Sequence, residues 1–333
     1  MEFFETNVGS TGAQTLVWAN DELIDWVGAR IYRLDGETTR ASLGIAYKFD
    51  SALSVPDGRG CVLYERLGTK ALLLYDGRIV REWNRSFYQA NRFDYPICLA
   101  QLEDGRQILV HCPDEYNRLE IEDLLSGTRL TTRDTESPDF FHSRLQISPD
   151  KKWLLSAGWC WHPIDALQVF ALDQILEKPE SLDAEPHFEI LDQDLEVQSA
   201  VFTPDSNLLI VTAREDYHEE LEDDQTFFGM KAGQVGLFSP SDKRMLWTKE
   251  WTTPPGRVEV GGPWALCLYE HPRLHRWSDW SLIHEWPHLC SGKQSSSIST
   301  ADSAVPAMCF DLGRNRFAVS DPSGVTVVEL KNT

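Results

Sequence analysis

One unit recurs along the chain: an apolar segment, a tight polar turn, and a second apolar segment of similar length. The clearest turns carry Asp57, Asp104, Asp150 and Asp205, which are spaced by 47, 46 and 55 residues. A period of about 45 residues built from short strands is typical of radial repeat folds, in which each unit buries its apolar face against the next. A chain of 333 residues has room for about seven such units.

Each unit is rich in Val, Ile, Leu, Tyr and Trp, and is broken by Asp, Gly, Pro and Asn. This is the pattern of short antiparallel strands, whereas helix signals are few. We assign the units to 16–41, 54–83, 99–131, 145–173, 201–216 resumed at 233–247, 263–286 and 308–330.

The turns at 148–150 and 203–205 read Ser-Pro-Asp and Thr-Pro-Asp, and here the chain resembles the WD-repeat β-propeller family. The resemblance covers most of the chain. The family's Gly-His pair and Trp-Asp dipeptide are absent from the expected places, and Asp279-Trp280 has the reverse order. The resemblance implies an all-β fold and a single domain over 1–333: a seven-bladed β-propeller of four-stranded antiparallel blades.

The last unit supplies only three strands, at about 305–310, 315–320 and 324–330. The segment Glu2–Val8 (EFFETNV) mixes apolar and polar residues before the first full unit. We predict that it closes the ring as the outer strand of the last blade, which is a common closure in the family. The alternative is a frayed terminal tail.

The stretch HEWPH (284–288) matches H-E-x-x-H, the pattern of zinc metalloproteases. Such a site needs both histidines on one face of a helix. Pro287 disfavours helix at Trp286, and the alternation upstream is that of a strand. We therefore predict the end of an outer strand running into a loop, and expect neither a metal nor a cofactor.

Nucleophile elbows, phosphate-binding loops and dinucleotide fingerprints do not occur in the sequence. These absences favour a binding module without catalytic residues. An enzyme with a site at the central channel stays open as an alternative, because a propeller can assemble a site from side chains that are distant in sequence. Loss of activity with a chelator, or upon substituting His162 or His284, would favour that alternative.

The net charge is −21, from 31 basic and 52 acidic residues. This charge argues against nucleic acid and anionic membranes as partners, and favours a basic protein. The seven cysteines are scattered without a C-x-x-C motif, which indicates buried thiols in a reducing compartment. No apolar run reaches the ~18 residues of a membrane helix, and the N-terminus lacks a signal-peptide pattern. We expect a cytoplasmic protein that is a monomer before it binds its partner.

In the family, loops joining the second and third strands of a blade share one face with loops joining successive blades. Aromatic and basic residues gather in the loops that this mapping places there. Trp159 and Trp161 are either exposed for binding or buried against a neighbouring blade. The candidates from these loops are Tyr88, Arg92, Phe93, Tyr95, Tyr116, Trp159, Trp161 and His162.

An acidic insertion, 214–230, interrupts the fifth unit, and a second acidic segment (177–196) is expected to be a linker plus an outer strand. The insertion is either a docking arm for a basic partner or a solvated mobile loop. The tract 292–304 is rich in serine and is expected to be a flexible loop. The candidate docking residues of the insertion are Glu215, Asp216, Tyr217, Glu219, Glu220, Glu222, Asp223, Asp224, Phe227 and Phe228.

Together these observations predict a propeller without catalytic activity that presents an acidic, aromatic-rich face to a basic protein partner. The most specific hypothesis is an inhibitor or immunity protein acting against a toxin or nuclease. Two alternatives stay open: an assembly scaffold with several partners, and a propeller hydrolase with its site at the central channel.

Overall fold

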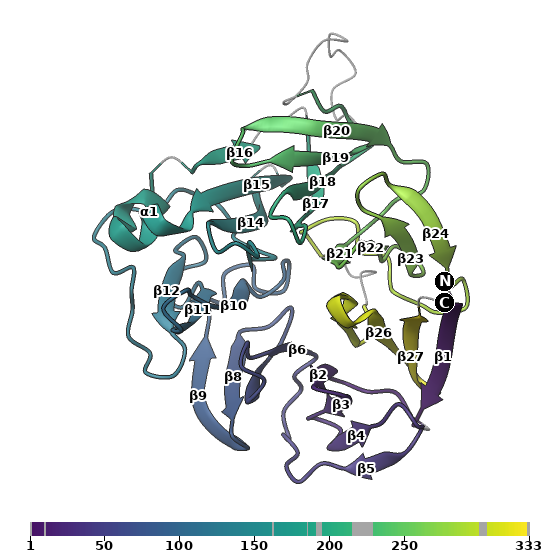
Figure 1. Cartoon of the computed structure of the whole chain (residues 1–333). Coiled ribbons are helices and arrows are strands. Elements are labelled where there is room, and N and C mark those ends of the chain that lie inside the picture. The colour runs from purple at the N-terminus through teal and green to yellow at the C-terminus, as the bar shows by residue number, and fades with distance from the viewer. Residues whose placement is uncertain are drawn as a thin grey trace.

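The computed structural model describes residues 2–9, 11–161, 163–184, 186–190, 195–214, 229–299 and 305–331. These residues form seven antiparallel sheets, arranged as blades around a ring (Figure 1). The first three blades are formed by β2 (Val17–Ala19), β3 (Glu22–Asp25), β4 (Arg30–Tyr32) and β5 (Thr38–Arg40); by β6 (Ser51–Ser54), β7 (Gly60–Tyr64), β8 (Lys70–Tyr75) and β9 (Arg78–Asn84); and by β10 (Ile97–Gln101), β11 (Gln107–His111) and β12 (Glu120–Asp123).

Blades four to six follow the same inner-to-outer order. Blade four consists of β13 (Gln146–Ile147), β14 (Trp153–Cys160), β15 (Ile164–Ala171) and β16 (Phe188–Ile190); blade five of β17 (Val197–Phe202), β18 (Leu208–Thr212), β19 (Gln234–Ser239) and β20 (Arg244–Glu250); and blade six of β21 (Val258–Gly261), β22 (Trp264–Cys267), β23 (Arg273–Arg276) and β24 (Ser281–Glu285). In the described residues, helix is confined to α1 (Leu172–Glu177), η1 (Pro179–Leu182) and η2 (Leu312–Arg314). The predicted all-β propeller is confirmed.

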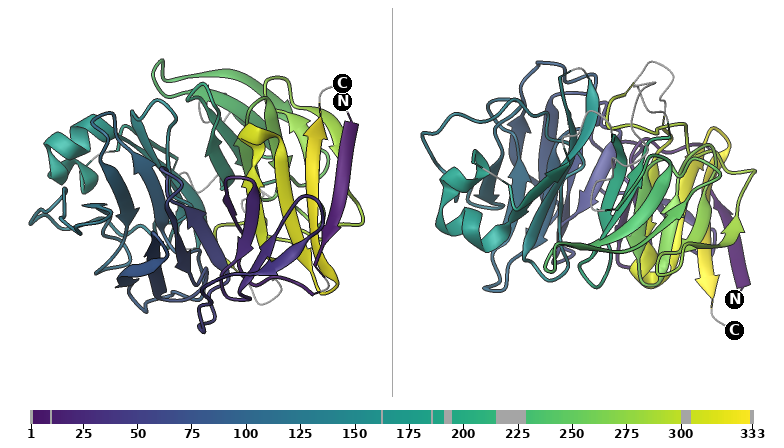
Figure 2. Two further views of the ribbon diagram at one scale, coloured as in Figure 1. Left: turned by 60° about the horizontal axis from the view of Figure 1, so that its bottom comes forward. Right: turned by 90° about the horizontal axis from the view of Figure 1, so that it is seen from above.

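Blade seven contains β25 (Met308–Asp311), β26 (Arg316–Asp321) and β27 (Gly324–Lys331), and its outer strand is β1 (Glu2–Val8). β1 pairs with β27 from Glu2 opposite Lys331 to Val8 opposite Val325. The two ends of the chain therefore lie side by side (Figure 2). The predicted ring closure is confirmed.

Blade three departs from the four-stranded pattern within the described residues. The irregular segment 128–131 lies beside β12 in place of a fourth strand, and an isolated antiparallel bridge joins Glu122 to Arg129. Leu130 N–H donates to Ile121 O at 2.7 Å, and Asp123 N–H donates to Thr128 O at 2.9 Å. The edge of β12 is thus covered without a regular strand.

The recurring aspartate turns share one backbone geometry. The residue after each aspartate has a positive φ: 73° at Gly58, 86° at Gly105, 60° at Lys151 and 62° at Ser206. The aspartate carboxylate caps the turn, as where Asp57 accepts the Arg59 N–H at 2.9 Å. Because aspartate favours such turns through its own side chain, the repeat remained visible even where glycine is replaced.

Seven apolar clusters hold the ring together, one between each pair of neighbouring blades. One of them, between blades six and seven, contains the buried side chains of Trp264, Trp286 and Phe317. α1 and η1 add Ile175 and Leu182 to the cluster between blades three and four. Each blade therefore buries its faces only against its neighbours, as expected for a repeat that cannot stand alone.

The HEWPH stretch lies where the sequence predicts it, at the end of β24 and in the turn that follows. His284 stacks on Phe3 with ring centroids 4.1 Å apart, and His288 Nε2 lies 2.7 Å from Glu5 Oε2. Both histidines therefore contact the closing strand β1. The helix that a zinc protease motif requires is not formed here.

Candidate functional site

The loop between β9 and β10 is organised by one buried arginine. The Arg85 guanidinium donates to the carbonyl oxygens of Gly68 at 2.7 Å, Ala90 at 2.6 Å and Phe93 at 2.9 Å. It also lies over the rings of Phe93 and Tyr95, at 4.5 and 5.0 Å from their centroids. Burial lowers the pKa of Arg85 to about 10, so the group remains charged at neutral pH. The loop is wrapped around a fixed cation.

Six aromatic side chains from three blades meet beside this loop, and we call them the face cluster. At its centre Phe141 stacks on Trp159 with ring centroids 3.7 Å apart and an angle of 9° between the planes. Tyr116 stacks on Phe141 at 4.4 Å. The face cluster consists of Tyr88, Phe93, Tyr116, Phe141, Trp159 and Trp161.

Exposure divides the face cluster into a floor and a surface. Phe93, Phe141 and Trp159 are buried, whereas Tyr88 is 46% exposed and Trp161 41% exposed. Phe87, next to Tyr88 in the sequence, is 87% exposed, the highest value among the large apolar side chains of the described residues, and it lines a separate pocket with Tyr47 and Lys70. Of the two readings for the tryptophans, burial applies to Trp159 and exposure to Trp161.

Of the two remaining loop candidates, Tyr95 has a structural role, whereas the side chain of Arg92 stays exposed. Tyr95 is buried between blades two and three, so its ring is not offered to a partner. Arg92 is exposed, and its carbonyl oxygen accepts the Ser299 N–H at 2.5 Å. The central residue of the stack, Phe141, was missed at the sequence level; its only local signal is the adjacent pair Phe140-Phe141.

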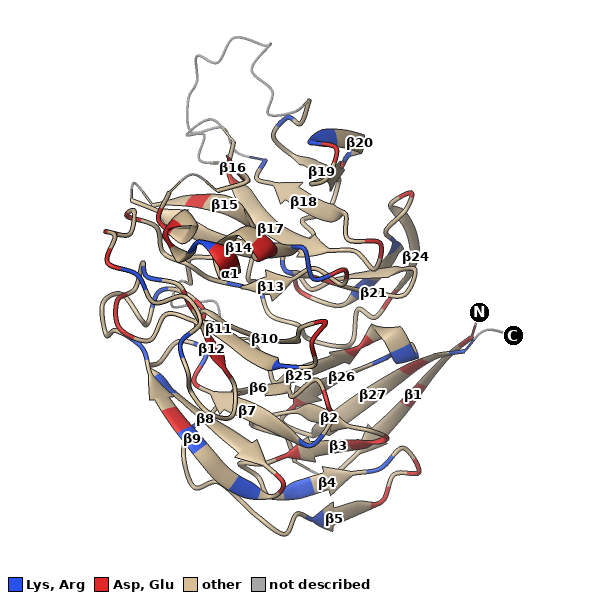
Figure 3. Ribbon diagram, turned by 60° about the vertical axis from the view of Figure 1, so that its left-hand side comes forward, with Lys and Arg blue, Asp and Glu red and all other residues tan. Residues whose placement is uncertain are grey.

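Exposed carboxylates lie on the two loops that carry Tyr116 and Phe141, and we call this set the acidic rim. Tyr116 O–H donates to Asp139 at 2.7 Å, which joins the rim to the aromatic surface. Burial, with this hydrogen bond, raises the pKa of Tyr116. Acidic residues also occur on β12 and α1 (Figure 3), but Glu120 and Glu122 of β12 are buried and paired with arginines, so they are not part of this exposed set. The acidic rim consists of Asp114, Glu115, Asp134, Glu136 and Asp139.

The rest of the predicted site cannot be placed. His162 and the candidate docking residues of the acidic insertion lie outside the described residues. These are Glu215, Asp216, Tyr217, Glu219, Glu220, Glu222, Asp223, Asp224, Phe227 and Phe228.

The serine-rich tract differs from the flexible loop expected from its composition. Its described part, 292–299, runs from blade six to the floor of the face cluster, where Ile298 bridges Phe93. Ser297 is buried: its N–H donates to Asp165 at 2.8 Å and its hydroxyl to Gly158 O at 2.9 Å. Residues 300–304 lie outside the described part of the chain. Composition missed this packing because the partners are far away in sequence.

Asp165 and Glu196 form a pair of carboxyl groups close to the face cluster. Asp165 is buried and lies opposite Trp159 in the pairing of β14 with β15. Burial raises the pKa of Asp165, and burial with the charge of Asp165 raises the pKa of Glu196 to about 7. The local charge here is therefore adjustable near neutral pH.

The centre of the ring holds two adjoining pockets of about 470 and 280 Å³. Both are lined by Tyr64, Arg257 and Glu259, so they form one continuous channel space. Arg66 pairs with Asp94 at 2.7 Å, and Arg257 Nε donates to Glu259 at 2.7 Å. The channel is lined by charged side chains of both signs together with apolar ones such as Leu53 and Val258.

Seven blades around a charged channel, with the first strand closing the last blade, define a seven-bladed β-propeller. Comparison with protein-family models and with curated protein sequences found no match. No helix among the described residues is long and apolar enough to cross a membrane. In that same part of the chain, no group of three or more His, Cys, Asp or Glu side chains is placed to hold a metal ion.

Proposed function

We propose that this protein is a binding module without catalytic activity, and that its face cluster receives a basic segment of a partner protein. The carrying observation is the exposure of Tyr88 and Trp161 above a buried aromatic floor, with the exposed Phe87 next to Tyr88 in the sequence. Aromatic side chains that are fixed in place before binding supply large contact areas at low entropic cost. Covering each of them contributes about 2 kcal/mol by area.

The negative charge of the acidic rim also supports the proposal of a basic partner. Five exposed carboxylates lie on the loops that carry Tyr116 and Phe141, on a chain of net charge −21. Of these, Asp114 has a basic partner, Arg129, at 2.7 Å. Such a surface attracts a cationic partner and speeds encounter at low salt.

Within this function, we favour a WD-repeat-like cytoplasmic inhibitor or immunity protein that neutralises a basic toxin or nuclease. The turn residues support the kinship, because Ser148 and Asp150 bond each other at 2.6 Å in the Ser-Pro-Asp turn. The seven cysteines are all free thiols, in keeping with a reducing compartment. The acidic insertion has the composition of a docking arm for a basic cleft.

The test is capture of partners by the wild-type protein and by a triple variant, F87A/Y88A/W161A, at low and high salt. We expect the wild type to capture a basic protein at low salt, less of it at high salt, and the triple variant to lose it. The matched control is I79A/V80A, which removes exposed apolar side chains from β9 at 50% and 45% exposure, away from the face cluster. Equal capture by the triple variant, or a partner indifferent to salt, would reject the proposal.

The same β9 residues favour the second candidate, an assembly scaffold. Ile79 and Val80 are exposed on an outer strand, which provides a second apolar surface on the rim of the ring. A scaffold would use both surfaces at once. Loss of one partner in the triple variant and of a different partner in I79A/V80A would favour it over a one-to-one inhibitor.

A further inference from the structure

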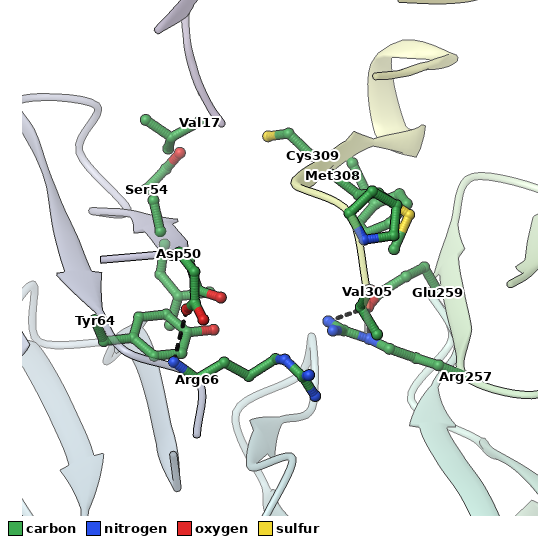
Figure 4. Close-up of a pocket in the computed structure, with 15 residues that line it drawn as sticks. Val17, Asp50, Ser54, Tyr64, Arg66, Arg257, Glu259, Val305, Met308 and Cys309 are labelled. Atoms are coloured by element: carbon green, nitrogen blue, oxygen red, sulfur yellow. Dashed lines mark hydrogen bonds and ion pairs between the residues drawn. The ribbon is translucent and has the colours of Figure 1, made fainter. Parts of the chain in front are cut away.

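Three arginines from different blades extend into the central channel. Arg66 follows β7, Arg144 precedes β13, and Arg257 precedes β21. Arg66 and Arg257 reach into the larger pocket from opposite walls (Figure 4). Arg144 and Arg257 line the adjoining pocket. Like charges that converge on one cavity repel each other unless negative charge lies between them.

The carboxylates of the channel only partly supply that charge. Asp94 is engaged by Arg66 and Glu259 by Arg257, while Asp50 accepts the Arg66 N–H at 2.7 Å. Arg144 has a different environment. Within the described residues no carboxylate lies at ion-pair distance from it.

The hydrogen bonds of Arg144 are also incomplete. Its Nε and one terminal nitrogen donate to the carbonyl oxygens of Ala157 at 3.1 Å and Gln198 at 2.6 Å. The other terminal nitrogen, Nη2, is buried and has no hydrogen-bond partner in the described structure. A guanidinium keeps its charge, so an unmet N–H in such a place is costly.

We propose that the channel binds a small molecule through a carboxylate or phosphate group, with Arg144 as the principal donor. The planar fork of arginine matches both groups, and an oxyanion would satisfy Nη2 and pair with the one of the three arginines that has no ion pair in the described residues. Tyr64 and Ser199 line the same space and carry hydroxyl groups. The pocket lined by Arg144 measures about 280 Å³ and opens into the larger one of about 470 Å³, which is within the range of small-molecule sites, about 300–1,000 Å³. The joined space therefore has room for a molecule larger than a bare ion.

The ionisation of Arg144 agrees with this assignment. Burial lowers its pKa, whereas the charges of Asp165 and Asp94 oppose the lowering. The charge of Arg257 adds to the lowering. The site is independent of the face cluster, so the two proposals can fail separately.

The test is calorimetric titration of the full chain with citrate, inorganic phosphate and glucose 6-phosphate at constant ionic strength. We expect saturable binding of at least one of them, and Arg144→Gln should weaken it by roughly tenfold or more. The matched control, Arg244→Gln, removes an exposed arginine that pairs with Asp242 at 3.7 Å, and should leave binding unchanged. Citrate binding identifies a carboxylate site, and binding of the phosphates a phosphate site.

Two outcomes overturn the proposal: no saturable heat with any of the three probes, or equal affinity in wild type and Arg144→Gln. If Arg144→Gln does not fold, Arg144→Lys is the second variant, since it keeps the charge but loses the planar guanidinium. Unchanged binding in Arg144→Lys would also overturn the proposal. A rise in Tm alone does not count as binding. Phosphate and related salts raise the Tm of most proteins through exclusion from the surface.

Discussion

Two aromatic clusters in different parts of the ring have similar side chains but differ in exposure: one is partly open to solvent and the other is covered. The face cluster rises from a buried floor to Tyr88 and Trp161, which are open to solvent. The other cluster, which we call the seam cluster, consists of Phe3, His284, Trp286 and Phe317 where blade six meets blade seven. Its stack ends beneath β1, and Trp286 is fully buried.

The difference between the two lies in what covers them. At the seam, a strand from the other end of the chain lays Phe3 against His284 and Trp286 at 4.1 and 5.6 Å. At the face, only loops surround the stack, and they leave its upper rings open. Aromatic residues therefore stabilise the ring at one place and offer a surface at the other.

The largest expected effect is the removal of Trp286. Trp286→Ala leaves a cavity at the junction that closes the ring, and should lower the free energy of unfolding by about 3–5 kcal/mol. Trp161→Ala, the matched change in the face cluster, should cost about 1 kcal/mol or less because its side chain is already part-exposed. Urea unfolding of both variants measures the contrast, and comparable losses would show that the face cluster is structural too.

A smaller effect is expected at the face itself. Arg85→Met keeps the volume but removes the donors to Gly68, Ala90 and Phe93, and should cost about 3 kcal/mol. The damage should remain local: hydrogen exchange should speed up in 85–96 and stay unchanged in β1. The control, Arg92→Met, removes an exposed arginine from the same loop and should alter neither quantity. Faster exchange in β1 as well would mean that the two clusters are mechanically coupled.

The sequence predicted what depends on local chemistry. The aspartate turns of the blades could be recognised because their geometry depends on neighbouring residues alone. At Asp57 the carboxylate bonds a backbone N–H two residues on, and Gly58 supplies the positive φ. Pro287 and the strand-like alternation before it predicted that HEWPH is not a helix, and the structure confirms this. Blade six was read from 263 onward, and its inner strand Val258–Gly261 was missed because its turn is a glycine-proline pair rather than an aspartate turn.

The features that the sequence did not predict depend on distant partners. Ser297 bonds Asp165 across 132 residues, and Gln294 approaches Asp94 across 200. Arg144 differs from the other channel arginines in having no carboxylate at ion-pair distance within the described residues and an unpartnered Nη2, which no spacing along the chain can indicate. Trp159 is buried and Trp161 is exposed although they are two residues apart, because β14 ends between them, at Cys160. The site's aromatic composition was predictable, whereas its division into floor and surface was not.

The smallest expected effect distinguishes the clusters by pH. The pKa of Glu196 is about 7 in the folded protein, against an ordinary value near 4.5. A raised carboxyl pKa means that the folded state holds its proton more tightly, so this contribution to stability is complete below pH 4.5 and is lost as the pH rises through 7. Glu196→Gln keeps the uncharged form, and should gain about 1 kcal/mol relative to wild type over that interval once partial exposure is allowed for. Urea unfolding at several pH values measures it, with Glu5→Gln at the seam as control.

The same titration adds negative charge beside the face cluster, so capture of a basic partner should strengthen between pH 6 and 8 in wild type but not in Glu196→Gln. Parallel stability curves for wild type and Glu196→Gln would place Glu196 in ordinary solvent, and the charge of the face would then be fixed across this range.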